Sequence, residues 1–343
     1  MFLNVKMQTL QDSNLLEMDF KQHYLNYKAL VDERLRDVVR KSEPRTLYEP
    51  VEYVLDGSGK RVRAVLVMLA AEAAGGSGLA ALDAGVGVEV LHNFTLVHDD
   101  IMDRAETRRG RQTVHRRWDE GAAILVGDVM IGLAHRILLE SNPPRLPDVV
   151  MAFTRGIIDV CEGQTLDREF ETRNDVTLED YLHMIAMKTG RLVETAAEVG
   201  GLIGGGTPEQ VEALQAYARH VGQAFQIQDD LLDIVAEETD LGKRIGGDVI
   251  EGKRTYLLVR ALERVQNGDD RKLLDTFMQN KGLPAEQVSE MLDLYRRHGV
   301  LDSARDDVGN YIRRAEQDLA PLPASPARDM LVWFGQMLMN RKG

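Results

Sequence analysis

Apolar residues recur along most of the chain at spacings of three and four positions, the spacing of one face of an α-helix. The segment 211–218, VEALQAYA, is typical of these runs. Only 6% of the residues are aromatic, and alternating runs of Thr, Val and Ile are few, so sheets are not expected. The pattern therefore predicts an all-α protein, a single large bundle of about ten to fourteen helices around a central cavity.

Glycine, proline and N-capping residues separate the helical runs. Such breaks stand at 75–78 (GGSG), 142–144 (NPP) and 204–206 (GGG). Thr207 followed by Pro208 has the order of an N-cap and a first helical residue. Ser325 followed by Pro326 repeats this signal before a C-terminal amphipathic helix.

No linker of low complexity divides the 343 residues, although their number alone would allow two domains. Hydrophobic residues make up 44% of the chain, which is ample for one core. We therefore predict a single domain over residues 1–343. Within it, residues 1–20 are expected to form a loosely ordered N-terminal segment.

Two acidic motifs of the same form lie inside long apolar runs: DDIMD at 99–103 and DDLLD at 229–233. Residues four apart share a helix face, so each motif points two carboxylates in one direction. Such like charges destabilise a helix and resist burial, and a bound cation removes both penalties. A few oxygen ligands favour Mg²⁺, which completes its shell with water and phosphate oxygens. The two helices predict a cleft that holds Mg²⁺ and a phosphorylated substrate.

Basic residues accompany these carboxylates. The segment 104–111 (RAETRRGR) follows the first motif, and 57–63 (GSGKRVR) opens another apolar helical run. Glycines let the backbone approach a phosphate, and a helix N-terminus adds its dipole. Further cations lie at Lys188, beside Thr189, and along 243–254. These segments predict local phosphate binding.

The glycine-rich segment is not a nucleotide-binding P-loop. Val54 stands where that motif requires a glycine, and Arg61 stands at its Ser or Thr position. Taken singly, the other signals have common structural explanations. Lys188 could lie beside a core helix, and His92 and His115 could be structural histidines. The joint occurrence of all of these signals favours the functional interpretation.

Seven segments together resemble the trans-isoprenyl diphosphate synthases, the polyprenyl synthetase family. They are GSGKRVR, HNFTLVHDDIMD, RRGRQTVH, EGQTLD, MKTG, GQAFQIQDDLLD and LGKRIGGDVIEGKRT, in the family's order over roughly residues 45–260. The chain departs from the family pattern at Ala64 and Gln112, where proline is usual. The resemblance implies an isoprenoid-synthase-like helical fold, a homodimer, and Mg²⁺-dependent head-to-tail condensation of isopentenyl diphosphate with an allylic diphosphate.

The resemblance also implies a role for each matching position. Six carboxylates would hold Mg²⁺, with three ions per active site: Asp99, Asp100, Asp103, Asp229, Asp230 and Asp233. Four residues would bind isopentenyl diphosphate: Lys60, Arg63, His92 and Arg109. Six would bind the allylic diphosphate: Arg108, Lys188, Thr189, Gln226, Lys243 and Lys253. Five of these residues would act directly in catalysis: Asp99, Asp103, Asp229, Lys188 and Arg108.

The chemistry explains why the site is rich in charge. Breaking an allylic carbon–oxygen bond leaves a carbocation and a diphosphate anion, so charge stabilisation matters more than a strong base. The isopentenyl double bond then attacks, and the proton passes to the departing diphosphate. Water would quench the cation, so apolar helices must exclude it.

Product length in the family depends on a bulky residue five positions before the first aspartate. That position is Phe94 here, with the small Thr95 beside it. The arrangement resembles short-chain synthases and implies a 20-carbon product, with 15 carbons as the second choice.

Two other functions are compatible with such a fold. A terpene cyclase would replace the second aspartate-rich motif with an Asn/Asp-Ser/Thr-Glu type, whereas 229–233 is intact. A non-catalytic regulatory subunit would usually lose motif residues, and none of the carboxylates or basic groups is lost here. Turnover by the isolated protein separates these alternatives.

Charge and cysteine content limit partners and location. The net charge is −13, from 55 acidic and 42 basic residues, which disfavours nucleic acid and anionic membranes. One cysteine, Cys161, suits a reducing cytoplasm. The N-terminus lacks a sustained apolar run, and no uncharged apolar stretch of about 20 residues occurs. We therefore predict a cytoplasmic enzyme without a signal peptide or transmembrane segment.

Overall fold

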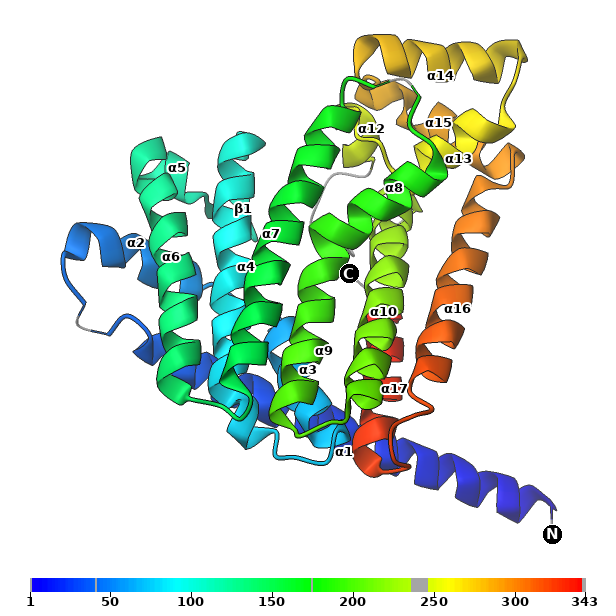
Figure 1. The fold of residues 1–343 in the computed structure, drawn as a ribbon. Coiled ribbons are helices and arrows are strands. Elements are labelled where there is room, and N and C mark those ends of the chain that lie inside the picture. The colour runs from blue at the N-terminus through cyan, green and yellow to red at the C-terminus, as the bar shows by residue number, and fades with distance from the viewer. Residues whose placement is uncertain (1, 41, 174, 236–245, 341–343) are drawn as a thin grey trace. The chain divides into compact units, whose positions relative to one another are not determined.

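The computed structural model describes residues 2–40, 42–173, 175–235 and 246–340, with side chains from Asp19 onward. Helices dominate these ranges (Figure 1), and fourteen of them have eight residues or more. The all-α class is therefore confirmed. Within the described ranges, the only strands are two of two residues each, joined as an antiparallel hairpin.

The longer helices are α1 (Phe2–Asp37), α2 (Arg45–Leu55), α3 (Val62–Ala73), α4 (Leu82–Met102), α6 (Glu120–Ser141), α7 (Leu146–Phe170), α8 (Leu178–Ile185), α9 (Arg191–Ile203), α10 (Pro208–Val235), α13 (Tyr256–Arg264), α14 (Gly268–Asn280), α15 (Val288–Arg297), α16 (Val300–Asp318) and α17 (Pro326–Met339). The short elements are η1 (Leu79–Ala81), β1 (Thr107–Arg108), β2 (Arg111–Gln112), α5 (Val114–Arg117), η2 (Ala186–Gly190), α12 (Gly247–Glu251) and η3 (Ala285–Gln287).

Two helix starts follow the predicted signals. The Thr207 Oγ1 atom accepts a hydrogen bond from the backbone N–H of Gln210 at 3.3 Å, and α10 begins at Pro208. The Ser325 Oγ atom accepts one from the N–H of Arg328 at 3.2 Å, and α17 begins at Pro326. These side chains satisfy backbone donors that the first helical turn leaves unpaired.

The loose order expected of the N-terminal segment stays a prediction. The backbone of residues 2–20, which the sequence predicts to be loosely ordered, is helical and belongs to α1.

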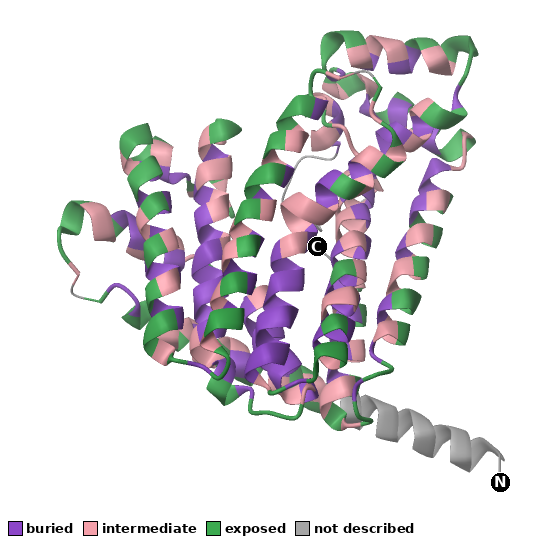
Figure 2. Ribbon diagram, viewed as in Figure 1, coloured by how far each residue is buried: buried purple, intermediate pink, exposed green. Residues whose placement is uncertain are grey.

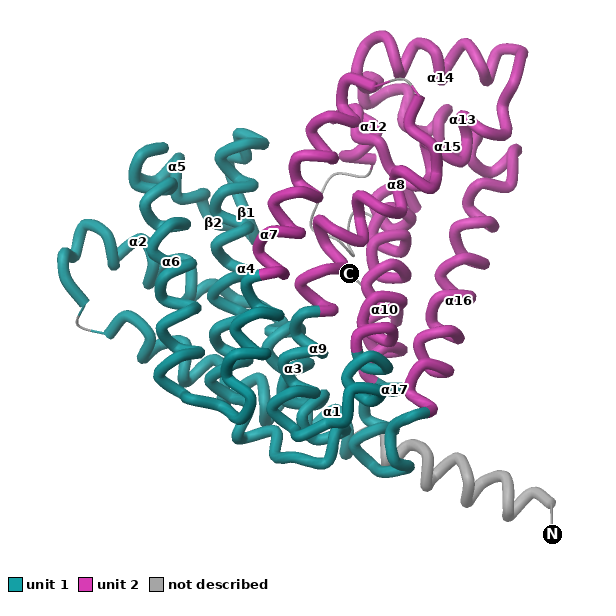
Figure 3. Tube along the Cα trace, in the orientation of Figure 1, with its two compact units in different colours: residues 1–154, 195–214, 321–333 teal, residues 155–194, 215–320, 334–343 magenta. Residues whose placement is uncertain are grey.

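The chain divides into two compact units (Figure 3). Unit 1 comprises residues 1–154, 195–214 and 321–333, and unit 2 comprises residues 155–194, 215–320 and 334–343. The first aspartate-rich motif belongs to unit 1 and the second to unit 2. A single domain over 1–343 with a central cavity stays a prediction.

The core of unit 1 surrounds α3 and α4 (Figure 2). Every residue from Ala64 to Ala71 on α3 is fully buried, as expected for a helix that is apolar on all sides. Helix α4 packs between α3 and α6. Gly85 allows this close approach, because a Cβ atom there would lie 2.7 Å from the Ala64 carbonyl oxygen.

Unit 2 has its own core, built mainly from α8, α10, α13, α14, α15 and α16. Its large, nearly inaccessible side chains include Tyr256, Phe277 and Tyr295. Ile227 and Leu231 of α10 belong to the same cluster. The apolar positions around the second motif therefore fix that stretch of α10 against unit 2.

One helix among the described residues, α6, is long and apolar enough to cross a membrane by length and composition alone. Core helices of water-soluble proteins pass the same test. Asp128 and Arg136 interrupt its sequence, and one side of it packs along α4.

Candidate active site

The first aspartate-rich motif lies at the C-terminal end of α4. The backbone N–H of Asp103 donates to the Asp99 carbonyl oxygen at 2.8 Å, so Asp103 caps the helix. A helix C-terminus carries partial negative charge, which disfavours carboxylates and favours cations. Asp99 and Asp103 are four residues apart and share a face. Asp99 and Asp103 should therefore attract a cation more strongly than two carboxylates in the middle of a helix would.

Asp100 has a different environment from its neighbours. It is only 4% exposed, and its Oδ1 atom accepts a hydrogen bond from Arg108 Nε at 2.8 Å. Burial raises the pKa of the Asp100 carboxyl, and the Arg108 charge acts in the opposite direction. The contact fixes Arg108, predicted to bind the allylic diphosphate, beside the first motif.

A β-hairpin carries both predicted phosphate-binding arginines of this region. Arg108 pairs with Arg111 in register, and Arg109 and Gly110 form the turn with φ of 52° and 73°. Two consecutive positive φ angles match the type I′ turn that suits a two-residue hairpin. This backbone costs a non-glycine residue about 1–3 kcal/mol. Arg109 is held there by its neighbours, and its Nη1 atom donates to the Ser58 carbonyl at 3.1 Å.

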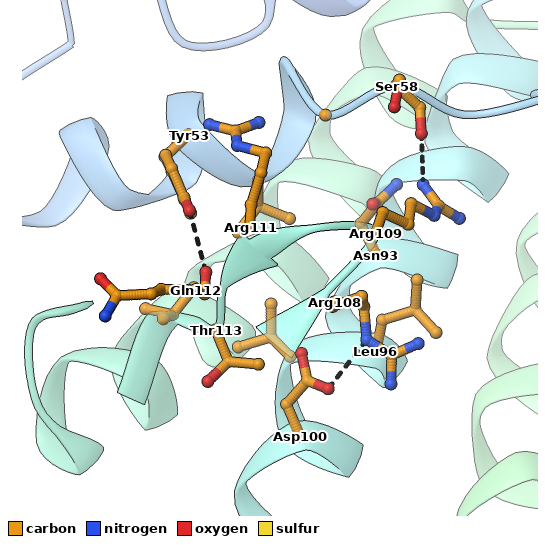
Figure 4. Close-up of a pocket in the computed structure, with 14 residues that line it drawn as sticks. Tyr53, Ser58, Asn93, Leu96, Asp100, Arg108, Arg109, Arg111, Gln112 and Thr113 are labelled. Carbon is orange, nitrogen blue, oxygen red and sulfur yellow. Dashed lines mark hydrogen bonds and ion pairs between the residues drawn. The ribbon is translucent and has the colours of Figure 1, made fainter. Parts of the chain in front are cut away.

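A pocket lies where this hairpin meets α4 and the glycine-rich loop (Figure 4). Three arginines and one carboxylate lie on its wall: Arg108, Arg109, Arg111 and Asp100. Apolar side chains such as Leu96, Val97 and Val114 supply the rest. The pocket combines positive charge with apolar surface, which complements a ligand made of an anionic diphosphate and a hydrocarbon.

Arg63 and His92 are brought together as the sequence predicts. Arg63 Nη1 lies 3.2 Å from His92 Nε2. A guanidinium has no acceptor, so His92 Nε2 must accept and the imidazole is neutral. Burial, reinforced by the positive charge of Arg63, lowers the pKa of His92 well below its usual value. Arg63 can therefore donate to an anion while His92, beside it, carries no positive charge.

The buried Arg61 was not identified from the sequence. Its side chain is 4% exposed and donates to Asp32 Oδ1 at 2.8 Å and to Glu89 Oε1 at 3.2 Å. Its Nη2 atom donates to the carbonyls of Leu55 and Gly57 at 2.9 and 2.8 Å. These contacts fix the glycine-rich loop, and with it the adjacent Lys60, from the side of the protein core. Three basic residues within GSGKRVR gave no signal that one of them points into the core.

Unit 2 carries the second motif near the C-terminal end of α10. Asp230 is 5% exposed and is surrounded by donors. Gln226 Nε2 donates to its Oδ1 at 3.0 Å, and its Oδ2 accepts from the Tyr181 hydroxyl at 2.5 Å and the Tyr256 N–H at 2.9 Å. Burial raises the pKa of Asp230 to about 7, while these hydrogen bonds oppose the rise. Asp229 and Asp233 lie on the less buried part of the same turn.

Lys188 and Thr189 lie on η2, a π-helical turn between α8 and α9. Such turns interrupt regular helices and are frequent at functional sites. Helix α7 passes very close to it, because a Cβ atom on Gly163 would lie 2.3 Å from the Lys188 backbone nitrogen. The Lys188 ammonium forms an ion pair with Asp167. Gly163 and Asp167 both belong to the EGQTLD segment, whose individual residues the sequence analysis left unassigned.

Lys253 lies beside further carboxylates of unit 2. Its Nζ atom is 3.2 Å from Asp248 Oδ1 and 2.8 Å from Glu251 Oε2. The backbone N–H of Asp248 donates to Asp233 Oδ2 at 3.0 Å, which links this segment to the second motif. Lys243, also predicted to bind the allylic diphosphate, lies outside the described residues.

The predicted residues thus fall into two charge clusters, one in each unit. Cluster 1 contains Lys60, Arg63, His92, Asp99, Asp100, Asp103, Arg108 and Arg109, and cluster 2 contains Lys188, Thr189, Gln226, Asp229, Asp230, Asp233 and Lys253. Among the described residues, no three His, Cys, Asp or Glu side chains converge as a metal cage. Mg²⁺ is usually bound through one or two carboxylates together with water and substrate phosphates.

An all-α fold with two DDxxD motifs, each accompanied by arginine or lysine, defines the isoprenoid synthase class. The polyprenyl synthetase family model matches residues 44–296 of this chain. The chain therefore belongs to the polyprenyl synthetase family.

Individual relatives agree with this assignment. A short chain isoprenyl diphosphate synthase from Methanothermobacter thermautotrophicus is 37% identical over 318 residues, 92% of this chain and 97% of the relative. A geranylgeranyl diphosphate synthase from Methanosarcina mazei is 37% identical over 319 residues, 92% of this chain and 96% of the relative. The crystal structure of a geranylgeranyl pyrophosphate synthetase from Pyrococcus horikoshii matches with a TM-score of 0.88 at 37% identity, covering 96% of this chain and 99% of that one.

Proposed function

We propose that the protein is a trans-prenyltransferase that condenses isopentenyl diphosphate head-to-tail with an allylic diphosphate. The products are an all-trans prenyl diphosphate, 20 carbons long with 15 as the second choice, and free diphosphate. The observation that carries this proposal is that both aspartate-rich motifs are complete, with Arg108 paired to Asp100 of the first and Lys253 linked to Asp233 of the second through Asp248. Two of the relatives are named geranylgeranyl diphosphate or pyrophosphate synthases, which supports the 20-carbon product.

The carboxylates of both clusters fit Mg²⁺. We propose Asp99, Asp103, Asp229 and Asp233 as its principal ligands, and three ions per active site. Mg²⁺ would neutralise the departing diphosphate and hold its oxygens in place. The contacts of Asp100 and Asp230 favour a supporting role for these two, which orient Arg108 and the Tyr181–Tyr256 pair.

Other side chains are proposed to bind the two diphosphates. Lys60, Arg63 and Arg109, with His92, bind the diphosphate of isopentenyl diphosphate, and the neutral His92 orients Arg63. The residues proposed to bind the allylic diphosphate and stabilise its departing charge are Arg108, Lys188, Thr189, Gln226, Lys243 and Lys253. No side chain is required as a base, because the departing diphosphate accepts the proton.

Phe94 is proposed to limit product length, with Thr95 beside it. Phe94 is 6% exposed, and its ring meets that of His98 edge-on at 5.0 Å between centroids. His98 Nε2 lies 3.2 Å from the Ile124 carbonyl of α6. Phe94 is therefore backed by His98 and α6, which gives it a fixed position from which to block a growing chain.

A homodimer is proposed from the surface of α6. Leu125 and Leu139 on this helix are 59% and 51% exposed, and Met151 on α7 is 64% exposed. Contiguous exposed apolar surface marks interaction sites between proteins, and these side chains are candidates for such a surface. The mass in solution, measured by light scattering, should be twice the chain mass of 38.4 kDa. A monomeric mass would contradict the dimer.

The cytoplasm remains the proposed location.

The first prediction concerns the reaction. Purified protein incubated with Mg²⁺, isopentenyl diphosphate and either a 5-, 10- or 15-carbon allylic diphosphate should consume isopentenyl diphosphate and yield a 20-carbon product. Mass spectrometry of the products measures this. Cyclic hydrocarbon without isopentenyl diphosphate consumption would favour a terpene cyclase, and no turnover would favour a regulatory subunit.

The second prediction separates the substrates. Arg109→Gln should raise the KM for isopentenyl diphosphate by about tenfold or more, the scale of a lost charge-assisted contact, with a smaller change for the allylic substrate. Lys188→Ala should do the reverse. Steady-state kinetics with each substrate varied in turn gives both values. Equal changes for the two substrates would show that the diphosphate sites are assigned wrongly.

The third prediction concerns Phe94. Phe94→Ala removes a buried ring, so it should lengthen the product by one or more five-carbon units. Phe153→Ala is a matched control, because it deletes another buried ring, which packs on His135 of α6. Chromatography of the dephosphorylated alcohols measures product length. The assignment fails if Phe94→Ala makes the wild-type product, or if both variants change it alike.

A further inference from the structure

Tyr53 connects α2 to the hairpin that carries Arg109. Its hydroxyl donates to the Gln112 carbonyl oxygen on β2 at 2.9 Å. The guanidinium carbon of Arg111, also on β2, lies 3.8 Å from the centre of the Tyr53 ring, and that of Arg117 lies 4.3 Å away. The ring of Trp118 meets Tyr53 edge-on at 5.3 Å. One half-buried tyrosine thus contacts a hydrogen-bond acceptor, two cations and an aromatic edge.

These contacts close a ring of interactions around the predicted isopentenyl diphosphate site (Figure 4). Tyr53 holds β2, and β2 pairs with β1 across the turn that contains Arg109. Arg109 in turn donates to the Ser58 carbonyl, five residues after Tyr53 in the chain. The glycine-rich loop and the hairpin therefore depend on the same tyrosine for their relative placement.

Arg109 needs such an anchor, because its position is unfavourable in two ways. Its φ of 52° lies in the left-handed region, which is strained for a side-chain-bearing residue. Its guanidinium also lies near that of Arg61. A Cβ atom on Gly59 would be 3.1 Å from Arg109 Nη1 and 3.0 Å from Arg61 Nη1. The Arg61 charge disfavours Arg109 there, and Glu89, which pairs with Arg61, offsets this repulsion.

We propose that Tyr53 is a positioning residue that holds Arg109 in place for the diphosphate of isopentenyl diphosphate. The inference rests on the proposed function of Arg109. The contacts of Tyr53 described above run to Gln112, Arg111, Arg117 and Trp118, so it would act through the hairpin and not on the reacting atoms. Its effect should therefore appear in the binding of isopentenyl diphosphate and be small for the allylic substrate.

Graded variants test the role. Tyr53→Phe removes the hydrogen bond to Gln112 and keeps the ring, so the KM for isopentenyl diphosphate should rise about threefold. Tyr53→Leu also removes the cation–π contacts, and the rise should reach about tenfold or more. Tyr48→Phe is the matched control, because it makes the same chemical change elsewhere on α2. Calorimetric dissociation constants for isopentenyl diphosphate should follow the same order.

A double-variant cycle tests whether the effect passes through Arg109. In the Arg109→Gln background, Tyr53→Phe should produce no further rise in the KM for isopentenyl diphosphate. A general loss of stability would instead add to the Arg109→Gln effect and raise both KM values alike, and either result overturns the inference. An unchanged KM in Tyr53→Leu overturns it as well. If Arg109→Gln raises this KM while the Tyr53 variants do not, the proposed function stands and only the Tyr53 role fails.

Discussion

The structure depends on charge compensation among carboxylates and cations that are concentrated in helical segments with apolar cores. Three predicted substrate-binding cations each lie against a carboxylate: Arg108 on Asp100, Lys188 on Asp167, and Lys253 on Asp248. Half-buried charges are tolerated only when paired. The pairing keeps each cation in a defined place without removing its ability to bind a phosphate. The diphosphates and Mg²⁺ of the proposed reaction would enter clusters whose internal charges are already nearly balanced.

Backbone conformation supplies the second constraint. Arg61, Arg104 and Arg109 all have positive φ angles, and all three lie in the loops around cluster 1. Left-handed arginines are strained, so each needs neighbours that fix it. For Arg61 these are Asp32 and Glu89, and for Arg109 they are Ser58 together with the Tyr53-bound hairpin. The proposed isopentenyl diphosphate site is thus rigid because of residues behind it.

The sequence predicts elements whose signals are local, such as the all-α class and the helix starts at Pro208 and Pro326. Motif spacing is a property of one helix or one loop, so the sequence also indicates which motif residues share an element. It does not distinguish Asp100 from Asp99, since burial depends on the hairpin that folds over α4. It likewise does not reveal Arg61 or Gly163. Their roles come from contacts with residues far away in sequence, and those distances are set by packing alone.

The central claim is that the aspartates of both motifs bind the Mg²⁺ that stabilises the departing diphosphate. Turnover measured against Mg²⁺ concentration in Asp99→Asn and Asp229→Asn tests it most directly, with Asp148→Asn on the surface of α7 as a control. Both motif variants should lose about 10²-fold or more in kcat, the scale of losing a preorganised electrostatic group. They should also need more Mg²⁺ for half-maximal rate, while the control behaves as wild type. Near-normal turnover and an unchanged Mg²⁺ requirement in Asp99→Asn would contradict the account.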